Sequence, residues 1–163
     1  MSARGRCAAL LFASTGSVWV LDRVTKIVVE DTLSGRPPLT LIPGVLDLRF
    51  TTNSGGAFSL GERTPWIFVG ASLVVSAAIV ATAFRHTSLP TAVALGSILG
   101  GALGNLTDRA IRGPHLSGHV IDFVDLHVWP VFNLADSAIV IGAIVLAISS
   151  MAAERRASTN DAG

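Results

Sequence analysis

Two aspartates, Asp122 and Asp136, are candidates for acid–base chemistry on a water molecule. Asp122 stands in the segment VIDF (residues 120–123) and Asp136 in the segment FNLADS (residues 132–137). Two carboxylates that share a site cannot both ionise cheaply, so they hold one proton between them. The ionised member can then take a proton from water while the protonated member polarises a carbonyl group, which is what peptide hydrolysis by carboxylates requires.

The residues alone leave other interpretations of these acids open. Asp136 also fits a first-turn acid that favours the positive end of a helix, and Asp122 fits a solvated loop acid. Asp125 follows Asp122 by three positions, so the two would share a face if that segment were helical. Other hydrolase types lack support, because the chain has neither a Gly-x-Ser-x-Gly nor a His-Glu-x-x-His motif.

The composition is that of a membrane protein. Half of the 163 residues are apolar and only 14% are charged, and the mean hydropathy is +0.61. Soluble domains carry about a quarter charged residues, so we predict a single membrane domain over residues 1–163. The net charge of +1 gives no basis for nucleic-acid binding. A lone Cys7 and the absence of Cys/His spacing give no support for a metal site, and no cofactor is expected.

Four apolar windows have about the 20 residues that a helix needs to cross a bilayer. They cover about residues 7–29, 65–84, 89–108 and 132–151. We therefore predict an all-α bundle of four transmembrane helices, with two long loops, about 30–64 and 109–131, on the same side. Partial alternation and β-branched residues over 45–52 predict a small β-structure in the first loop, and the second is predicted as a loop.

Basic residues gather in the short segments outside the windows. They are Arg4, Arg6, Arg85, Arg155 and Arg156. Since cytoplasmic segments are enriched in Lys and Arg, we predict cytoplasmic termini and outer long loops. A cleaved signal peptide is the alternative for the N-terminus, because two of these arginines precede the apolar residues 7–21; its removal would leave three spans.

This topology brings polar residues of three spans to the outer boundary. They are Asp22 and Lys26 in the first span, Asn105, Asp108 and Arg109 in the third, and Asn133 and Asp136 in the fourth. A charge in the bilayer costs about 2.5 to 3.5 kcal/mol on insertion scales, so such a layer indicates function. Asp22 and Lys26 are four residues apart and can pair on a helix, which favours a structural role. Arg109 fits substrate binding or a snorkelling anchor equally well.

Glycines recur every four residues at Gly96, Gly100 and Gly104, which makes one face of the third helix flat and predicts a central position for it. Two other classes of function have less support. A transporter or proton channel predicts acids near the bilayer midplane and an inverted repeat, and neither is visible. An assembly factor that binds a partner helix through the glycine face leaves the polar layer unexplained.

Five motifs make the chain resemble the bacterial prolipoprotein signal peptidases, also called signal peptidase II. The motifs are Asp22 with Lys26, NSGGAF at 53–58, GNLTDR at 104–109, VIDF at 120–123 and FNLADS at 132–137. Each is a weak pattern alone, but the five stand in the right order on four correctly spaced spans. The resemblance covers almost the whole chain.

The resemblance implies a membrane aspartic endopeptidase that removes signal peptides from diacylglyceryl-modified prolipoproteins, cutting just before the lipidated cysteine. It implies a location in the bacterial inner membrane, an active site near the outer face, contact with membrane lipid, and inhibition by antibiotics of the globomycin type. Asp122 and Asp136 correspond to the catalytic acids of the family. Two departures, Gly56 and Ser59, concern substrate fit and leave the acids untouched.

The other polar residues of the motifs also receive expected roles. We assign substrate positioning to Asn53, Asn105, Arg109 and Asn133. Asp22, Lys26 and Asp108 are assigned a structural role in the polar layer. Asp122 is chosen over Asp125 by its motif and not by its spacing.

Overall fold

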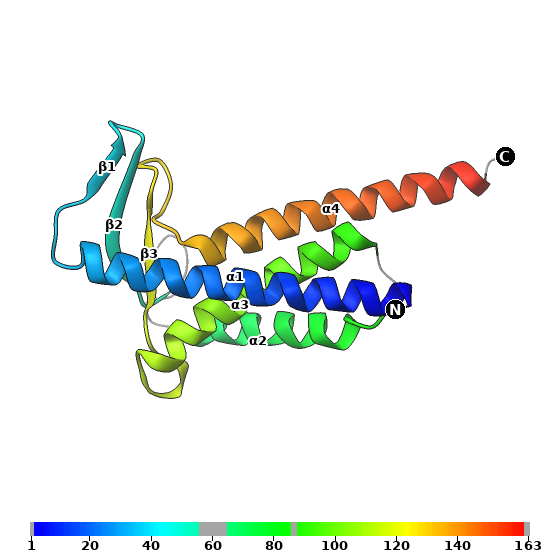
Figure 1. Cartoon of the computed structure of the whole chain (residues 1–163), viewed down its shortest axis with the longest axis horizontal. Coiled ribbons are helices and arrows are strands. Elements are labelled where there is room, and N and C mark those ends of the chain that lie inside the picture. The colour runs from blue at the N-terminus through cyan, green and yellow to red at the C-terminus, as the bar shows by residue number, and fades with distance from the viewer. Residues whose placement is uncertain (1, 56–64, 86–87, 162–163) are drawn as a thin grey trace.

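The computed structural model describes residues 2–55, 65–85 and 88–161. Its elements are α1 (Ala3–Leu33), β1 (Leu39–Ile42), β2 (Leu46–Asn53), α2 (Pro65–Thr82), α3 (Leu89–Ile111), a short 3₁₀ helix (Pro114–Leu116), β3 (Val120–Asp125) and α4 (Leu134–Asp161). The helices run along one another, and the three strands lie at one end of the bundle (Figure 1).

Glycines let α3 pack directly on the backbone of α1. A Cβ added at Gly100 would lie 2.7 Å from the carbonyl oxygen of Thr15 and 2.8 Å from Cβ of Val18. A Cβ added at Gly96 would meet the carbonyl oxygen of Leu11. Because no side chain intervenes, the two helices approach closely along this face.

A second face of α3 packs in the same way on α4. A Cβ added at Gly101 would meet the carbonyl oxygen of Ala135, and one added at Gly142 of α4 would lie 2.8 Å from the carbonyl oxygen of Ala94. The third helix is therefore in contact with both α1 and α4, as the glycine spacing predicted, and it fixes the distance between their polar residues.

Replacing Gly100 by alanine is expected to lower the stability of the bundle. The new methyl group would overlap the α1 backbone, and overpacking of this kind costs about 1 to 3 kcal/mol. Gly16 of α1 is the matched control, because nothing lies within 4 Å of a Cβ added there. We expect a lower Tm in detergent for Gly100→Ala and an unchanged or higher Tm for Gly16→Ala; equal values would contradict this packing.

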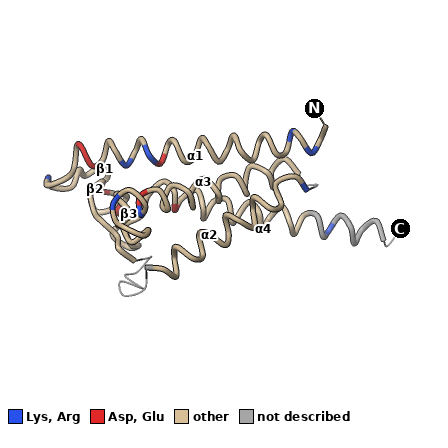
Figure 2. Tube along the Cα trace, turned by 90° about the horizontal axis from the view of Figure 1, so that it is seen from below, with Lys and Arg blue, Asp and Glu red and all other residues tan. Residues whose placement is uncertain are grey.

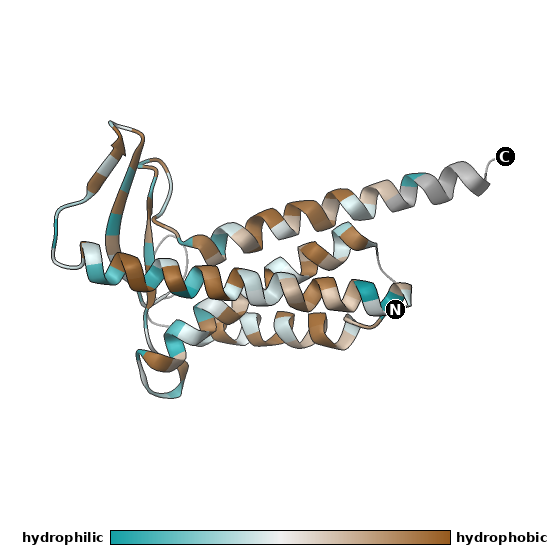
Figure 3. Ribbon diagram, in the orientation of Figure 1, coloured by the Kyte–Doolittle hydropathy of each residue, from teal (hydrophilic) through white to brown (hydrophobic). Residues whose placement is uncertain are grey.

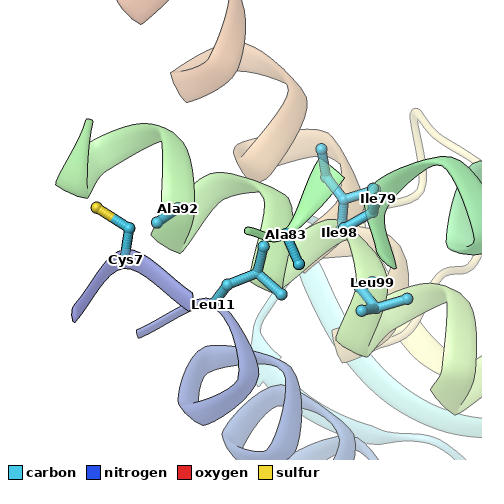
Figure 4. Packing of buried hydrophobic residues seen from close by; sticks show 7 residues of the cluster. All are labelled: Cys7, Leu11, Ile79, Ala83, Ala92, Ile98 and Leu99. Carbon is cyan, nitrogen blue, oxygen red and sulfur yellow. The ribbon is translucent and has the colours of Figure 1, made fainter. Parts of the chain in front are cut away.

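A cluster of buried apolar side chains joins α2 to α1 and α3 near the end of the bundle that carries the N-terminus. It consists of Cys7, Leu11, Ile79, Ala83, Ala92, Ile98 and Leu99 (Figure 4). This core lies away from the strands. Apolar packing thus joins the three helices at this end of the bundle.

The strands form an antiparallel sheet in the order β1-β2-β3. Ile121 and Phe123 of β3 are buried together with Val29 of α1, so one face of the sheet packs on the end of that helix. The small β-structure predicted from residues 45–52 is present, but the prediction of a loop around Asp122 is wrong. Its strand pairs with β2, so the structure of this segment depends on a partner far away in the sequence.

Three helices within the described residues are long and apolar enough to cross a membrane. They contain the stretches Ala3–Leu33, Leu89–Ile111 and Leu134–Ala152. The apolar stretch of α2, Trp66–Thr82, is shorter. Apolar residues dominate the bundle (Figure 3), while the acidic residues of α1 and α3 gather toward the end that carries the strands (Figure 2).

Candidate active site

Asp136 is positioned by the cap of helix α4. Asn133 precedes the helix, and its Oδ1 accepts a hydrogen bond of 2.9 Å from the backbone N–H of Asp136. In return, Oδ2 of Asp136 accepts a hydrogen bond of 3.2 Å from the backbone N–H of Asn133. This reciprocal arrangement is a capping box. Asn133 is therefore the N-cap residue of α4, about one turn before Asp136.

Asp122 is held by two side-chain amides. The residue is 2% exposed. Asn133 donates from Nδ2 to Oδ1 of Asp122 at 2.6 Å, and Asn53 donates from Nδ2 to Oδ2 at 2.9 Å. The backbone N–H of Gly55 donates to Oδ1 of Asn53 at 3.0 Å, which fixes the orientation of that amide.

Asn133 therefore contacts both carboxylates and brings them together. Its side chain binds Asp122, and its backbone N–H binds Asp136. Burial raises the pKa of Asp122 to about 6, and the negative charge of Asp136 contributes to the rise, while the amide hydrogen bonds oppose it. The two acids can thus hold one proton between them, with Asp122 as the protonated member below about pH 6.

Asn105 connects Asp136 to the charged residues inside the bundle. Its Nδ2 donates to Oδ1 of Asp136 at 2.8 Å, and its Oδ1 accepts from Nζ of Lys26 at 3.0 Å and from Nδ2 of Asn133 at 3.2 Å. A flipped amide would point Nδ2 at the Lys26 ammonium and Oδ1 at the carboxylate. Both contacts would be repulsive, so Lys26 determines which way Asn105 faces.

Lys26 lies between two carboxylates. Its Nζ is 2.8 Å from Oδ2 of Asp22 and 2.9 Å from Oδ2 of Asp108, and all three side chains are fully buried. Asp22 and Lys26 form the pair that their spacing predicted, and Asp108 of α3 completes a group of three. Buried charges need partners of this kind, because an unpaired charge in an apolar interior is costly.

Each carboxylate of this group also holds the backbone beside a candidate acid. Oδ1 of Asp22 accepts from the N–H of Ala135 at 3.0 Å, next to Asp136. Oδ2 of Asp108 accepts from the N–H of Ile121 at 3.2 Å, next to Asp122. The buried charges are therefore connected to both strand β3 and the start of α4.

Sequence reasoning missed a further set of charges around Asp108. Arg23 contacts Oδ1 of Asp108 at 2.5 Å, and Nε of Arg112 is 3.6 Å from the same oxygen. Arg112 also forms a two-pronged pair with Glu30, at 2.7 and 2.6 Å. A charged residue inside an apolar window, such as Arg23, is the signal that could have indicated this set.

Arg109 faces the site and not the surface. The residue is 6% exposed, and its guanidinium donates to the carbonyl oxygens of Gly55 at 2.7 Å and Asn105 at 3.4 Å. The snorkelling interpretation does not fit this burial.

Arg109 lines a cavity of about 280 Å³ together with Asn53, Asn105 and Asp136. Phe68, Ala71 and Ser72 of α2 also line it, so this helix contributes to the site.

Asp125 does not belong to the pair. It lies three residues after Asp122 on a strand, where successive side chains alternate between faces. Its carboxylate is 3.1 Å from Nε of Arg49 and accepts from the backbone N–H of His127. The remaining part of the NSGGAF motif, residues 56–58, and the departure at Ser59 lie outside the described residues.

Comparison with known proteins relates the chain to one family. Residues 14–152 match the family model described as signal peptidase (SPase) II. A lipoprotein signal peptidase of Rhodococcus jostii is 41% identical over 143 residues, which are 87% of this chain and 72% of the relative. One of Syntrophomonas wolfei is 43% identical over 144 residues, 88% of this chain and 93% of the relative.

Two solved structures share the fold. Both are described as bacterial membrane enzymes. The first has a TM-score of 0.75 and 28% identity, and the similarity covers 86% of this chain and 87% of that one. The second has a TM-score of 0.72 and 28% identity, with coverage of 85% and 90%. The fold of this chain is therefore that of two bacterial membrane enzymes.

Proposed function

Because this chain belongs to the signal peptidase II family of aspartic-type membrane peptidases, we propose that Asp122 and Asp136 are the catalytic pair with which it processes prolipoproteins. The substrate is a prolipoprotein with a diacylglyceryl-modified cysteine, and the cut falls just before that cysteine. The observation that carries this proposal is that Asn133 hydrogen bonds to both carboxylates, at 2.6 and 3.2 Å.

The pair acts on water with each acid in a distinct role. Ionised Asp136 takes a proton from the water, whose oxygen forms a bond to the carbonyl carbon, while protonated Asp122 gives its proton to the carbonyl oxygen. The tetrahedral intermediate then breaks its C–N bond. Asp136 passes the proton to the leaving amine of the cysteine, and the re-forming carbonyl returns the other proton to Asp122.

The cavity of about 280 Å³ beside Asp136 suits the peptide backbone around the cut bond. Its lining includes Arg109, Asn53 and Asn105. Their side chains carry N–H groups, which can donate hydrogen bonds to peptide carbonyl oxygens. We assign these residues, with Asn133, to positioning of substrate and acids. The buried group of Asp22, Lys26 and Asp108 then supports the site from inside the bundle.

The pH dependence of cleavage follows from the raised pKa of Asp122. The active form needs Asp122 protonated, so kcat/KM is expected to fall as pH rises through about 6, the pKa of this carboxyl in the free enzyme. Bound substrate excludes water and disfavours ionisation further, so the fall of kcat should occur at higher pH than the fall of kcat/KM. Initial rates between pH 5 and 8 check this. A kcat/KM that is constant or rises over that range would contradict it.

The topology that we propose has four membrane spans and cytoplasmic termini. It places the strands and the site at the outer face of the inner membrane. Ser117, which precedes β3, is exposed, while Cys7 is buried, so Ser117→Cys provides a reporter. An impermeant maleimide should label this variant in intact cells. Labelling only after the cells are broken would show that the strands and the site face the cytoplasm, and it would contradict this topology.

The function itself is tested with purified protein and a diacylglyceryl-modified prolipoprotein. Mass spectrometry should find a free signal peptide and a protein that begins with the lipidated cysteine. We expect a cyclic peptide of the globomycin type to block this reaction. Cleavage at another bond, or equal cleavage of a precursor whose cysteine carries no lipid, would contradict the proposed substrate.

A further inference from the structure

A second cavity, of about 350 Å³, is also lined by Asp136. We call it the apolar cavity. Leu126, Trp129 and Phe132 line it from the segment between β3 and α4, and Val140 and Ile141 line it from the first two turns of α4. The cavity thus begins at a candidate catalytic acid and continues along a helix that is apolar enough to cross a membrane.

The two cavities that meet at Asp136 differ in chemistry. The cavity described above holds Asn53, Asn105 and Arg109, whereas no basic residue from the described parts of the chain lines the apolar cavity. A phosphate group would find no cationic partner there. Apart from Asp136 and Ser137, the lining residues are apolar, so a neutral hydrocarbon chain suits this cavity.

We propose that the apolar cavity receives one acyl chain of the diacylglyceryl group on the substrate cysteine. This inference rests on the proposed function, because it needs a lipid-modified substrate. The lipidated cysteine supplies the nitrogen of the cut bond, so its glycerol group is only a few bonds from the point where Asp136 acts. An acyl chain that leaves the glycerol there reaches the apolar cavity directly.

The role of the cavity is to orient the substrate. Hydrocarbon gains little free energy when it moves from lipid to an apolar protein surface, because lipid tails are as apolar as leucine. A chain fixed between the 126–132 segment and α4 does, however, restrict how the cysteine lies against the acids. Correct placement of reacting groups is a large part of catalysis.

The test fills the cavity and compares substrates that differ only in acyl length. Val140→Trp places an indole in the apolar cavity, and Ile144→Trp is the matched control; the two residues are 57% and 54% exposed, and Ile144 is outside the cavity lining. The substrates are prolipoproteins whose cysteine carries two palmitoyl or two butyryl chains. We measure kcat/KM for both with each variant in the same detergent.

For Val140→Trp, the ratio of kcat/KM on the palmitoyl substrate to that on the butyryl substrate should fall at least about tenfold, while Ile144→Trp keeps the wild-type ratio. Ile141→Trp should behave like Val140→Trp, and it replaces Val140→Trp in the test if Val140→Trp folds poorly. Equal losses on both substrates, or an unchanged ratio, would overturn the inference and leave the peptidase function standing. Wild-type protein that cleaves neither substrate would overturn the proposed function, and this inference with it.

Discussion

Asp122→Asn and Asp136→Asn variants are each expected to lose about a thousandfold or more in kcat on a diacylglyceryl-modified prolipoprotein. An asparagine at position 136 cannot accept a proton from water, and one at position 122 cannot donate a carboxyl proton to the carbonyl oxygen. Because the two acids act as a unit, removing either should abolish most of the reaction. Steady-state rates with purified variants provide the measurement.

Asp125→Asn is the matched control for this loss. Asp125 lies on the same strand as Asp122 and is also buried, but it contacts Arg49 and His127 and not the site. Its variant should keep kcat within about twofold of wild type, since its contacts are outside the reacting groups. Comparable losses in all three variants would mean that folding of the strand, and not the pair, explains the result. Near-normal activity in either pair variant would refute the assignment.

Lys26→Met is expected to reduce both stability and turnover. Lys26 is the cation shared by two fully buried carboxylates, Asp22 and Asp108. Breaking a buried charge pair by removing one partner typically costs about 3 to 5 kcal/mol. The amide of Asn105 also loses the partner that sets its orientation toward Asp136. We therefore expect a lower Tm and, below that Tm, a kcat reduced by about tenfold.

The control for this effect is Arg23→Met on the same helix. Arg23 is partly exposed and contacts Asp108, which keeps Lys26 as a partner when Arg23 is removed. The cost should stay near 1 kcal/mol, as for partly exposed pairs, with little change in kcat. If the two methionine variants had the same Tm and the same kcat, the buried lysine would have no special role.

Much of the bundle could be predicted because the signals are local. Apolar windows indicate helices through composition alone, and the described helices fall on them. The spacing of Asp22 and Lys26 predicts their pairing on one helix, and Gly100 predicts a close helix contact through its missing side chain. None of these inferences depends on knowing which distant segments meet.

The arrangement of the site could not be predicted, because it depends on contacts between distant segments. Asp122 is in a strand because that segment pairs with β2, where Thr51 is its partner across the ladder. Its amide partner Asn53 is 69 residues away in the sequence. Asn133 fits both a helical position and a cap, and only the start of α4 decides between them. The choice of Asp122 over Asp125 as a catalytic acid rests on the family motif and not on spacing.

A single-turnover cleavage in water labelled with oxygen-18 tests the central claim most directly. The claim is that water, activated between Asp122 and Asp136, attacks the peptide bond before the lipidated cysteine. With enzyme in excess over substrate, mass spectrometry should find one oxygen-18 atom in the new carboxyl group of the released signal peptide. An unlabelled carboxyl group in this first turnover would show that the oxygen came from the enzyme, and it would contradict the direct attack of water.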